Sequence, residues 1–423
     1  MNRDVDRRLA ELSEVLGLRF ALRHGDTPTN ERTRQVRRPP HLLVTTPETF
    51  QLMFTGHRLR AMLSSVQAVI IDEVHDLAGS ERGWQLRLGL QRLEALCGRT
   101  LQKVGLSATV GNPDQVASWI SNGSCQPILA PAERSTVLTV ETAPPLAEDE
   151  VGAMEMRLSP RAHATFRLMA EIVENDPPCL VFVNSRNAAE TVAQRLQTMA
   201  PQLTIGVHHG SLAAETRQEM EENIRNGTLQ ALICTSSLEL GIDVGSIRKI
   251  VQLESPRSVD RMLQRVGRAD HRIGGIGRGH LLAWETDGIA ESAVIAHRSH
   301  LGSIEDVEWR NRPYSIAANQ IMLMAHSFKV VRIDDVHEIF ERTEQFADWT
   351  RKDTENTLAV LADRWLLRYS LDPNETPWYR WPKHLYLAAK DAIPDADSWP
   401  DELPRYDVSV SYTHLTLPTT LVV

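Results

Sequence analysis

The run Val69-Ile70-Ile71 is followed directly by Asp72, Glu73, Val74 and His75. A continuous Val/Ile run predicts a strand that is buried on both faces, as in a parallel sheet. Ligand chemistry in open α/β sheets gathers at the carboxyl ends of the strands. Asp72 and Glu73 therefore stand where one carboxylate can hold the Mg²⁺ of a nucleotide while its neighbour polarises the attacking water. An ordinary solvated turn also accommodates such an acidic pair, so the later motifs decide between the two interpretations.

Strand-like and helical patterns alternate from the start of the chain to about residue 300. Such alternation predicts an α/β fold with parallel sheets. The strand-like runs lie at 42–44, 66–71, 101–106, 179–183, 204–208, 229–234 and 247–253. The Pro- and acid-rich stretch 143–150 interrupts them. We therefore predict two tandem α/β domains, one over residues 1–145 and one over 151–305.

Beyond residue 305 the pattern becomes helical, with runs at 315–328, 334–346 and 353–368. Three helices that close on a short strand near Tyr369 predict a winged-helix domain over residues 306–375, followed by the start of a further domain over 376–408. Residues 409–423 contain no Asp, Glu, Lys or Arg and match nothing before them. We interpret them as a non-native tail and exclude them from the fold.

The composition excludes several classes of protein. No apolar run is long enough to span a bilayer and no signal-peptide pattern is present, so we expect a cytoplasmic protein without a membrane partner. The four cysteines are widely spaced, which favours small buried hydrophobes over disulfides or metal ligands. The net charge of -9 argues against indiscriminate coating of nucleic acid but leaves room for a local basic groove.

A phosphate-binding loop of the form G-x-x-x-x-G-K-[ST] is absent from the sequence. None of the six lysines follows a glycine. An enzyme that hydrolyses nucleotides needs the amides and lysine of such a loop to hold the β- and γ-phosphates. We therefore expect the chain to be a fragment that has lost this loop and that is inactive by itself.

Polar residues follow several of the predicted strands. Thr46, Pro47 and Glu48 open a helix after the first strand-like run, where helix amides can hold a nucleic-acid phosphate, although an ordinary N-cap has the same pattern. Ser107 and Thr109 follow the run at 101–106, where their hydroxyls are candidates for coupling the nucleotide site to nucleic acid. In the second domain the residues that repeat this geometry are Arg186, His209, Gly210 and Thr235. We predict that this last group contacts nucleic acid together with Thr46, Pro47 and Glu48.

The segment 264–272 places two arginines, Arg265 and Arg268, three residues apart. On a helical turn such residues share one face, so both can reach toward a γ-phosphate. Arginine fingers of this kind stabilise the charge of the transition state. An exposed basic helix is the alternative interpretation.

With these motifs in place, the chain resembles the superfamily 2 DExH helicases, and most closely the large helicase-related (Lhr) family. The likeness is strongest at 23–28, 70–75 and 105–113. The resemblance implies two RecA-like domains and a winged helix that act as an ATP-dependent 3'-to-5' translocase. It also implies roles for single residues: Asp72 in holding Mg²⁺, Glu73 in activating water, His75 in linking to Ser107 and Thr109, Gly241, Asp243 and Gln264 in contacting ATP, and Arg265 and Arg268 as fingers. Asp270 stands where the family usually has Gly.

The partner that the resemblance implies is single-stranded or forked DNA, in DNA repair or recombination. RNA or a DNA–RNA hybrid stays open as a partner, because a Ski2-like RNA helicase would share these motifs and the 2'-OH contacts that distinguish RNA leave no sequence pattern. A non-catalytic nucleic-acid-binding scaffold is the alternative from another class, and the missing phosphate loop favours it for the chain as given.

Overall fold

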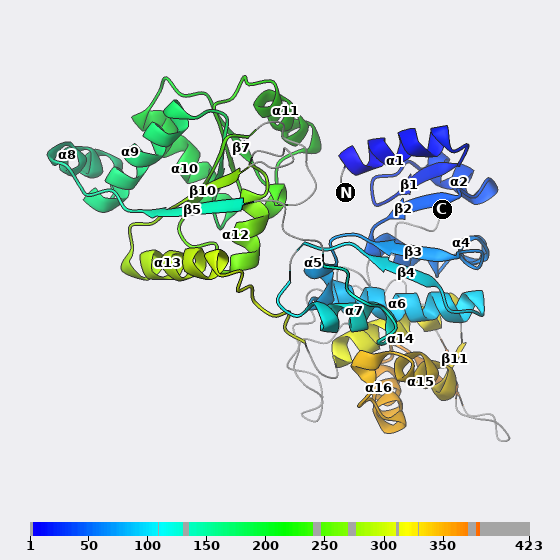
Figure 1. Ribbon diagram of the computed structural model, residues 1–423. Coiled ribbons are helices and arrows are strands. Elements are labelled where there is room, and N and C mark those ends of the chain that lie inside the picture. The colour runs from blue at the N-terminus through cyan, green and yellow to red at the C-terminus, as the bar shows by residue number, and fades with distance from the viewer. Residues whose placement is uncertain are drawn as a thin grey trace. The chain divides into compact units, whose positions relative to one another are not determined.

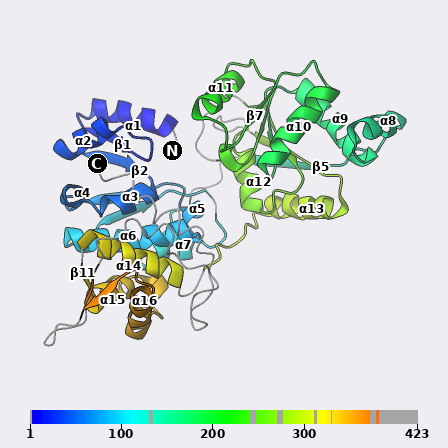
Figure 2. The same cartoon turned by 180° about the vertical axis from the view of Figure 1, so that it is seen from behind.

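A computed structural model describes residues 3–108, 110–129, 135–239, 247–269, 276–309, 313–328, 330–370 and 378–380. It divides into two compact units, shown from opposite sides in Figures 1 and 2. The central unit consists of Leu129–Asp306 with Met1–Arg8 and Thr109–Gly111, and the split unit consists of Leu9–Ala108, Asn112–Ile128 and the chain from Val307 onward. Within the described residues, no helix has the length and apolar character needed to cross a membrane.

The central unit is built on a six-stranded parallel sheet with the order β5-β10-β9-β6-β8-β7. Its strands are β5 (Ser135–Glu141), β6 (Cys179–Phe182), β7 (Ile205–His208), β8 (Ala231–Cys234), β9 (Lys249–Leu253) and β10 (Ile276–Leu282). Its helices are α8 (Ala147–Met156), α9 (Pro160–Asn175), α10 (Arg186–Met199), α11 (Ala214–Arg225), the 3-10 helix η1 (Ser236–Leu238), α12 (Val259–Val266) and α13 (Thr286–His300). The prediction of a parallel α/β fold is confirmed. The sheet begins before the predicted boundary at 143–150, because β5 pairs with β10.

Alternate side chains of β6 enter two hydrophobic cores on opposite faces of the sheet. Cys179 and Val181 pack with α9 and α10, whereas Leu180 and Phe182 pack with α11, α12 and α13. This division follows from the two-residue period of a strand. Cys179 and Cys234 are fully buried free thiols, as predicted, and burial raises the pKa of the Cys179 thiol to about 12. The same prediction is wrong for Cys97 and Cys125, which are only partly buried.

A buried carboxylate joins α8 to α9 in the central unit. Asp149 Oδ1 lies 2.8 Å from His163 Nδ1, Arg167 Nη2 donates to Asp149 Oδ2 at 3.0 Å, and the Leu146 amide donates to the same oxygen at 2.8 Å. Burial alone would raise the pKa of the Asp149 carboxyl, but these hydrogen bonds outweigh it and lower the pKa from 3.8 to about 2. The ionised form of Asp149 is therefore the form that stabilises this part of the fold.

We expect Asp149→Asn to lower the free energy of unfolding at pH 7 by about 2 kcal/mol. The folded-state pKa lies below the unfolded value, so the contribution is complete above pH 4 or so and is lost as the pH falls toward about 2. Urea unfolding at several pH values measures the effect. Glu148→Gln is the matched control, because Glu148 is an exposed carboxylate 3.8 Å from the same arginine. A difference between Asp149→Asn and wild type that stays constant down to pH 3 would contradict this account.

The chain begins with α1 (Arg3–Val15), and the split unit contains two parallel strand pairs, β1–β2 and β3–β4. The elements before residue 128 are β1 (Phe20–Arg23), α2 (Thr29–Arg37), β2 (Leu42–Thr45), α3 (Pro47–Met53), α4 (His57–Leu63), β3 (Ala68–Ile71), α5 (Val74–Ala78), α6 (Glu81–Cys97), β4 (Gln102–Gly105) and α7 (Pro113–Ser121). Helix α6 is buried along most of its length, because α3 and α5 pack on it together with the helices that follow residue 313.

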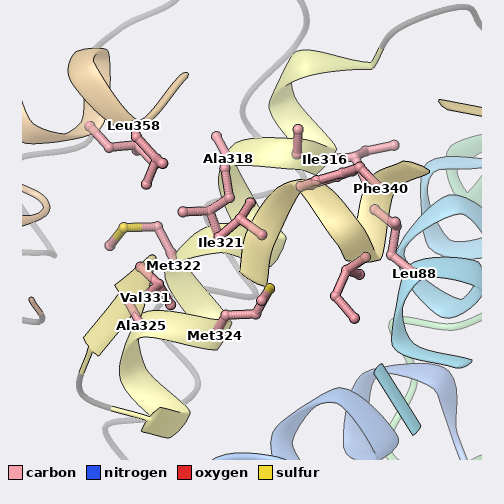
Figure 3. Packing of buried hydrophobic residues seen from close by; sticks show 14 of the residues in the cluster. Leu88, Ile316, Ala318, Ile321, Met322, Met324, Ala325, Val331, Phe340 and Leu358 are labelled. Atoms are coloured by element: carbon pink, nitrogen blue, oxygen red, sulfur yellow. The ribbon is translucent and has the colours of Figure 1, made fainter. Parts of the chain in front are cut away.

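Those later helices share one hydrophobic core with α6. The elements are α14 (Tyr314–Phe328), β11 (Val330–Arg332), α15 (Ile333–Glu341), the 3-10 helix η2 (Glu344–Phe346), α16 (Arg351–Asp363), β12 (Arg368–Ser370) and β13 (Trp378–Arg380). Figure 3 shows Leu88 of α6 beside Ile316 and Phe340, and Trp84 belongs to the same cluster. A polar contact adds to it, since Arg92 Nη1 of α6 donates to Gln320 Oε1 at 3.1 Å.

The predicted separate domain over 306–375 is thus packed onto a helix of the predicted first domain. Its strands β11 and β12 form an antiparallel sheet with β13, in the order β11-β13-β12. Because β13 lies beyond residue 375, this sheet crosses the predicted boundary between the domain over 306–375 and the further domain over 376–408. The winged-helix assignment stays a prediction. Most of the predicted further domain over 376–408, and all of the predicted tail over 409–423, lie outside the described residues.

Candidate nucleotide and nucleic-acid sites

Backbone hydrogen bonds join the carboxyl ends of β3 and β4 in the split unit. Leu106 N donates to Ile71 O at 2.8 Å, and Val74 N donates to Leu106 O at 2.9 Å. Parallel strands bring their carboxyl ends to the same edge of a sheet, so the residues that follow β3 lie directly beside those that follow β4. Asp72 and Glu73 are therefore held at the end of β3, next to the loop after β4.

Glu73 has a strained backbone at this position. Its φ of 51° and ψ of 48° lie in the left-handed region, where a residue with a Cβ is uncommon. Such strain persists where the surrounding structure holds it, and it is concentrated at functional sites. The Glu73 amide donates to Asp72 Oδ1 at 3.0 Å, and the Asp72 side chain is exposed. This hydrogen bond holds the Asp72 carboxylate at the end of the strand, and Glu73 Oε2 lies 3.6 Å from His75 Nδ1.

His75 connects this strand end to the loop after β4. The Ala108 amide donates to His75 Nδ1 at 3.2 Å, and Ser107 Oγ lies 3.4 Å from the same nitrogen. Because a backbone amide can only donate, Nδ1 is the acceptor and a neutral imidazole carries its proton on Nε2. The structure thus brings His75 to Ser107, as the resemblance implied. The other predicted partner of His75, Thr109, lies outside the described residues.

The predicted nucleic-acid contact at the start of α3 is built around its N-cap. Thr46 Oγ1 accepts from Thr49 N at 3.3 Å, and Pro47 occupies the first turn. Arg82 Nε donates to Glu48 Oε1 at 2.5 Å, which ties α3 to α6. Thr46 and Glu48 therefore have structural roles in addition to the predicted one.

Four residues predicted to contact nucleic acid lie at one edge of the central sheet: Arg186 follows β6, His209 and Gly210 follow β7, and Thr235 follows β8. These strands are parallel neighbours, which explains the shared edge. His209 is largely buried, with Nε2 2.9 Å from Glu190 Oε1. The Thr235 amide donates to His208 O at 3.3 Å, so neighbouring strand ends are linked here as well.

The two predicted arginine fingers have different surroundings. Arg265 is 2 % exposed, its Nε donates to Glu239 Oε1 at 2.7 Å, and it also bonds Gln252. Its guanidinium lies over the Phe182 ring, 5.0 Å from the centroid. Helix α12 ends at Val266, so Arg268 lies just beyond it, and Arg268 Nη2 donates to the backbone oxygen of Glu239 at 2.6 Å.

Arg268 lies beyond the end of α12, so the two arginines do not both stand on that helix, but both of them contact Glu239. A buried guanidinium needs a carboxylate partner, because desolvation of an unpaired charge is costly. Glu239 meets this need for Arg265, and nothing in the spacing of the sequence indicates that pairing. Sequence reasoning had singled out neither Glu239 nor Gln252.

Two protein families match separate parts of the sequence. Residues 1–116 match the DEAD/DEAH box helicase family, and residues 164–274 match the helicase conserved C-terminal domain. The first match contains the strand end with Asp72 and Glu73. The second contains the predicted contacts of the central sheet and both arginines.

Relatives from archaea and bacteria extend over most of the chain. The ATP-dependent helicase Lhr-Core protein 2 of Thermococcus barophilus is 32% identical over 379 residues, which are 86% of this chain and 43% of the relative. The Lhr helicase/uracil glycosylase of Escherichia coli is 32% identical over 404 residues, which are 85% of this chain and 26% of the relative. The chain belongs to the Lhr helicase family. The matched part of this chain spans less than half the length of each of these two relatives.

A solved structure supports the same family. The Mycobacterium smegmatis helicase Lhr, bound to ssDNA and AMP-PNP, is 33% identical and superposes with a TM-score of 0.78 over 93% of this Lhr-family chain and 53% of its own. The RecA-like fold predicted from the sequence is confirmed. Of the residues predicted to contact ATP, Gly241 and Asp243 lie outside the described residues, and Gln264 is half-buried in α12.

Proposed function

We propose that this Lhr-family chain is the motor part of an ATP-dependent helicase that moves 3' to 5' on single-stranded DNA, in DNA repair or recombination. The observation that carries the proposal is the end of β3. There, Asp72 and Glu73 are followed closely by His75, which contacts the loop after β4. These are the side chains that nucleotide hydrolysis would use to hold Mg²⁺ and to activate water. The family membership supports the use of ATP, since relatives carry the name ATP-dependent helicase.

The residues at this strand end fit a nucleotide that carries Mg²⁺. Such a nucleotide supplies the phosphoanhydride bond and a divalent charge. Asp72 offers an exposed carboxylate to the cation, which keeps most of its water and needs only one or two carboxylates. Glu73 accepts the proton of the attacking water. His75 couples a change in this site to Ser107 through their contact, and Arg268 contributes positive charge toward the γ-phosphate.

One face of the β3–β4 pair supports the view that a phosphate-loop segment completes this site. Ile70, Leu106 and Val104 are 63%, 51% and 38% exposed. The opposite face packs on α7, where Ile120 would meet any side chain at Gly105. Parallel strands are normally covered on both faces. We propose that a phosphate-loop segment covers the exposed face, and we call this chain joined to such a segment the complete motor.

The proposed path of DNA includes Thr46 in the split unit and Arg186 and Thr235 in the central unit. Helicase grooves hold the sugar-phosphate backbone of one strand, so binding is tolerant of sequence and sensitive to salt. The helices after residue 313 form the proposed winged helix beside this path. Deleting them is a poor test, because the deletion would expose the core that they share with Trp84 and Leu88.

We expect the chain to bind single-stranded DNA with an affinity that falls by roughly a hundredfold or more between about 50 and 200 mM salt. Arg186→Ala should weaken binding of all sequences alike and lower the salt slope by about 1. Fluorescence anisotropy with labelled single-stranded DNA, RNA and duplex DNA measures both effects. Arg195→Ala, further along α10, is the matched control. Tighter binding of RNA would favour the RNA-helicase alternative, and binding independent of salt would contradict the proposed groove.

A further inference from the structure

The segment 305–309 is bound at its first residue to α12, the helix that contains Arg265 and ends just before Arg268. The amide of Val259, the first residue of α12, donates to Glu305 Oε1 at 3.1 Å and to Oε2 at 3.0 Å. The Asp260 amide lies 3.4 Å from Glu305 Oε2, and Arg298 Nη1 donates to Oε1 at 3.2 Å. Ser258 occupies the N-cap position of α12 but makes no side-chain cap bond. Glu305, which is distant in the sequence, therefore caps this helix in place of the Ser258 side chain.

Two residues later the same segment is bound to the loop that follows Ser107. Val307 N donates to Asn112 Oδ1 at 2.9 Å, and Asn112 Nδ2 donates to Val307 O at 3.2 Å. Asn112 stands at the N-cap of α7, where an Asn side chain usually accepts from the helix amides, yet it makes no such bond. Its side-chain amide instead binds both backbone polar groups of one distant residue, Val307, as a strand neighbour would. Trp309 Nε1 strengthens the attachment by donating to Gln115 Oε1 at 2.8 Å.

Glycine at position 111 permits this arrangement. A Cβ there would lie 2.5 Å from Asp306 Oδ1 and 2.7 Å from the backbone oxygen of Glu305. The chain crosses between the two compact units at Gly111–Asn112 and again at Asp306–Val307. Only Asp306 lies in the chain between Glu305, which caps α12, and Val307, which Asn112 holds.

We propose that Asn112 and Glu305 are positioning residues that connect the Ser107 loop to the arginine helix α12. We call the pair, with Asp306 and Val307 between them, the clasp. This inference rests on the proposed ATP-driven function. A change at His75 and Ser107 reaches Asn112 within five residues of chain, passes to Val307 and through Asp306 to Glu305, and acts on the first turn of α12. The clasp touches no reacting atom, so its effect is on the placement of Arg268.

Amide hydrogen exchange on the chain as it stands tests whether the clasp exists. We expect Asn112→Ala to speed exchange at the Val307 amide about tenfold, because that amide loses its acceptor. Glu305→Ala should do the same at Val259. Asn112→Asp and Glu305→Gln keep an acceptor and should preserve the protection. Unchanged exchange of the β6 amides shows that each variant is folded. Unchanged exchange at Val307 and Val259 in the Ala variants would overturn the proposal.

Turnover in the complete motor tests what the clasp does. We expect Asn112→Ala to lower nucleic-acid-stimulated ATP turnover tenfold or more while nucleotide and DNA affinities stay the same, because a displacement near 1 Å can cost roughly 10²-fold. Asn112→Asp and Glu305→Gln should recover most of the rate, and Asn226→Ala at the end of α11 is the control. If the wild-type motor hydrolyses ATP and Asn112→Ala has the same turnover, the clasp proposal is wrong and the proposed function stands. A complete motor without any turnover defeats the proposed function instead.

Discussion

Replacing Glu73 with Gln in the complete motor is expected to lower ATP turnover by on the order of 10² to 10⁴, the usual contribution of a positioned general base. The substitution keeps the size of the side chain and removes only its ability to accept a proton. Nucleotide and single-stranded DNA affinities should therefore stay close to those of wild type. Steady-state hydrolysis with and without DNA, together with titration of a fluorescent nucleotide, separates the two effects.

Two controls complete this experiment. Glu355→Gln removes a surface carboxylate of α16 that pairs with Arg351, and it should leave turnover unchanged. The chain without the phosphate-loop segment should show no turnover, because the amides and lysine that hold the β- and γ-phosphates are absent from its sequence. Turnover of Glu73→Gln within threefold or so of wild type would remove Glu73 from the mechanism.

Arg268→Ala and Arg265→Ala are expected to fail in different ways. Loss of Arg268 should reduce turnover by roughly 10³, as loss of an arginine finger does, and should cost about 1 kcal/mol of stability through the hydrogen bond to Glu239 O. Loss of Arg265 should instead lower the free energy of unfolding by about 3 to 5 kcal/mol, because it leaves the Glu239 carboxylate buried without its partner. Chemical unfolding and turnover measured on both variants test this distinction.

A double variant identifies the cause of the Arg265 effect. Arg265→Ala combined with Glu239→Ala removes both charges of the buried pair. The free energy of unfolding that this double variant loses should therefore be smaller than the sum of the losses in the two single variants. Additive losses would show that the pairing is not the source of the instability. A stable Arg265→Ala variant with turnover as low as that of Arg268→Ala would instead restore Arg265 as a second finger.

Local patterns in the sequence were sufficient for the architecture and for part of the site. The apolar run before Asp72 predicted the strand β3, but the expected burial on both faces is wrong, because Ile70 is 63% exposed. The same reasoning predicted the buried strands β6 and β8 and the burial of Cys179 and Cys234. The contact between His75 and Ser107 followed from a resemblance, and it forms because the ends of neighbouring parallel strands meet.

Contacts between distant segments were decided only by the tertiary structure. Glu239 lies 26 residues from Arg265, Asn112 lies 195 residues from Val307, and the helices after residue 313 share a core with α6. No local period encodes such pairs, because each depends on where the folded chain returns and on which buried polar group still needs a partner. The sequence by itself determined the α/β fold, the adjacent carboxylates and the absence of a phosphate-binding loop from the given residues. Tertiary structure decided that Arg265 is held inside its own unit, and that one short segment binds both the loop after Ser107 and the helix before Arg268.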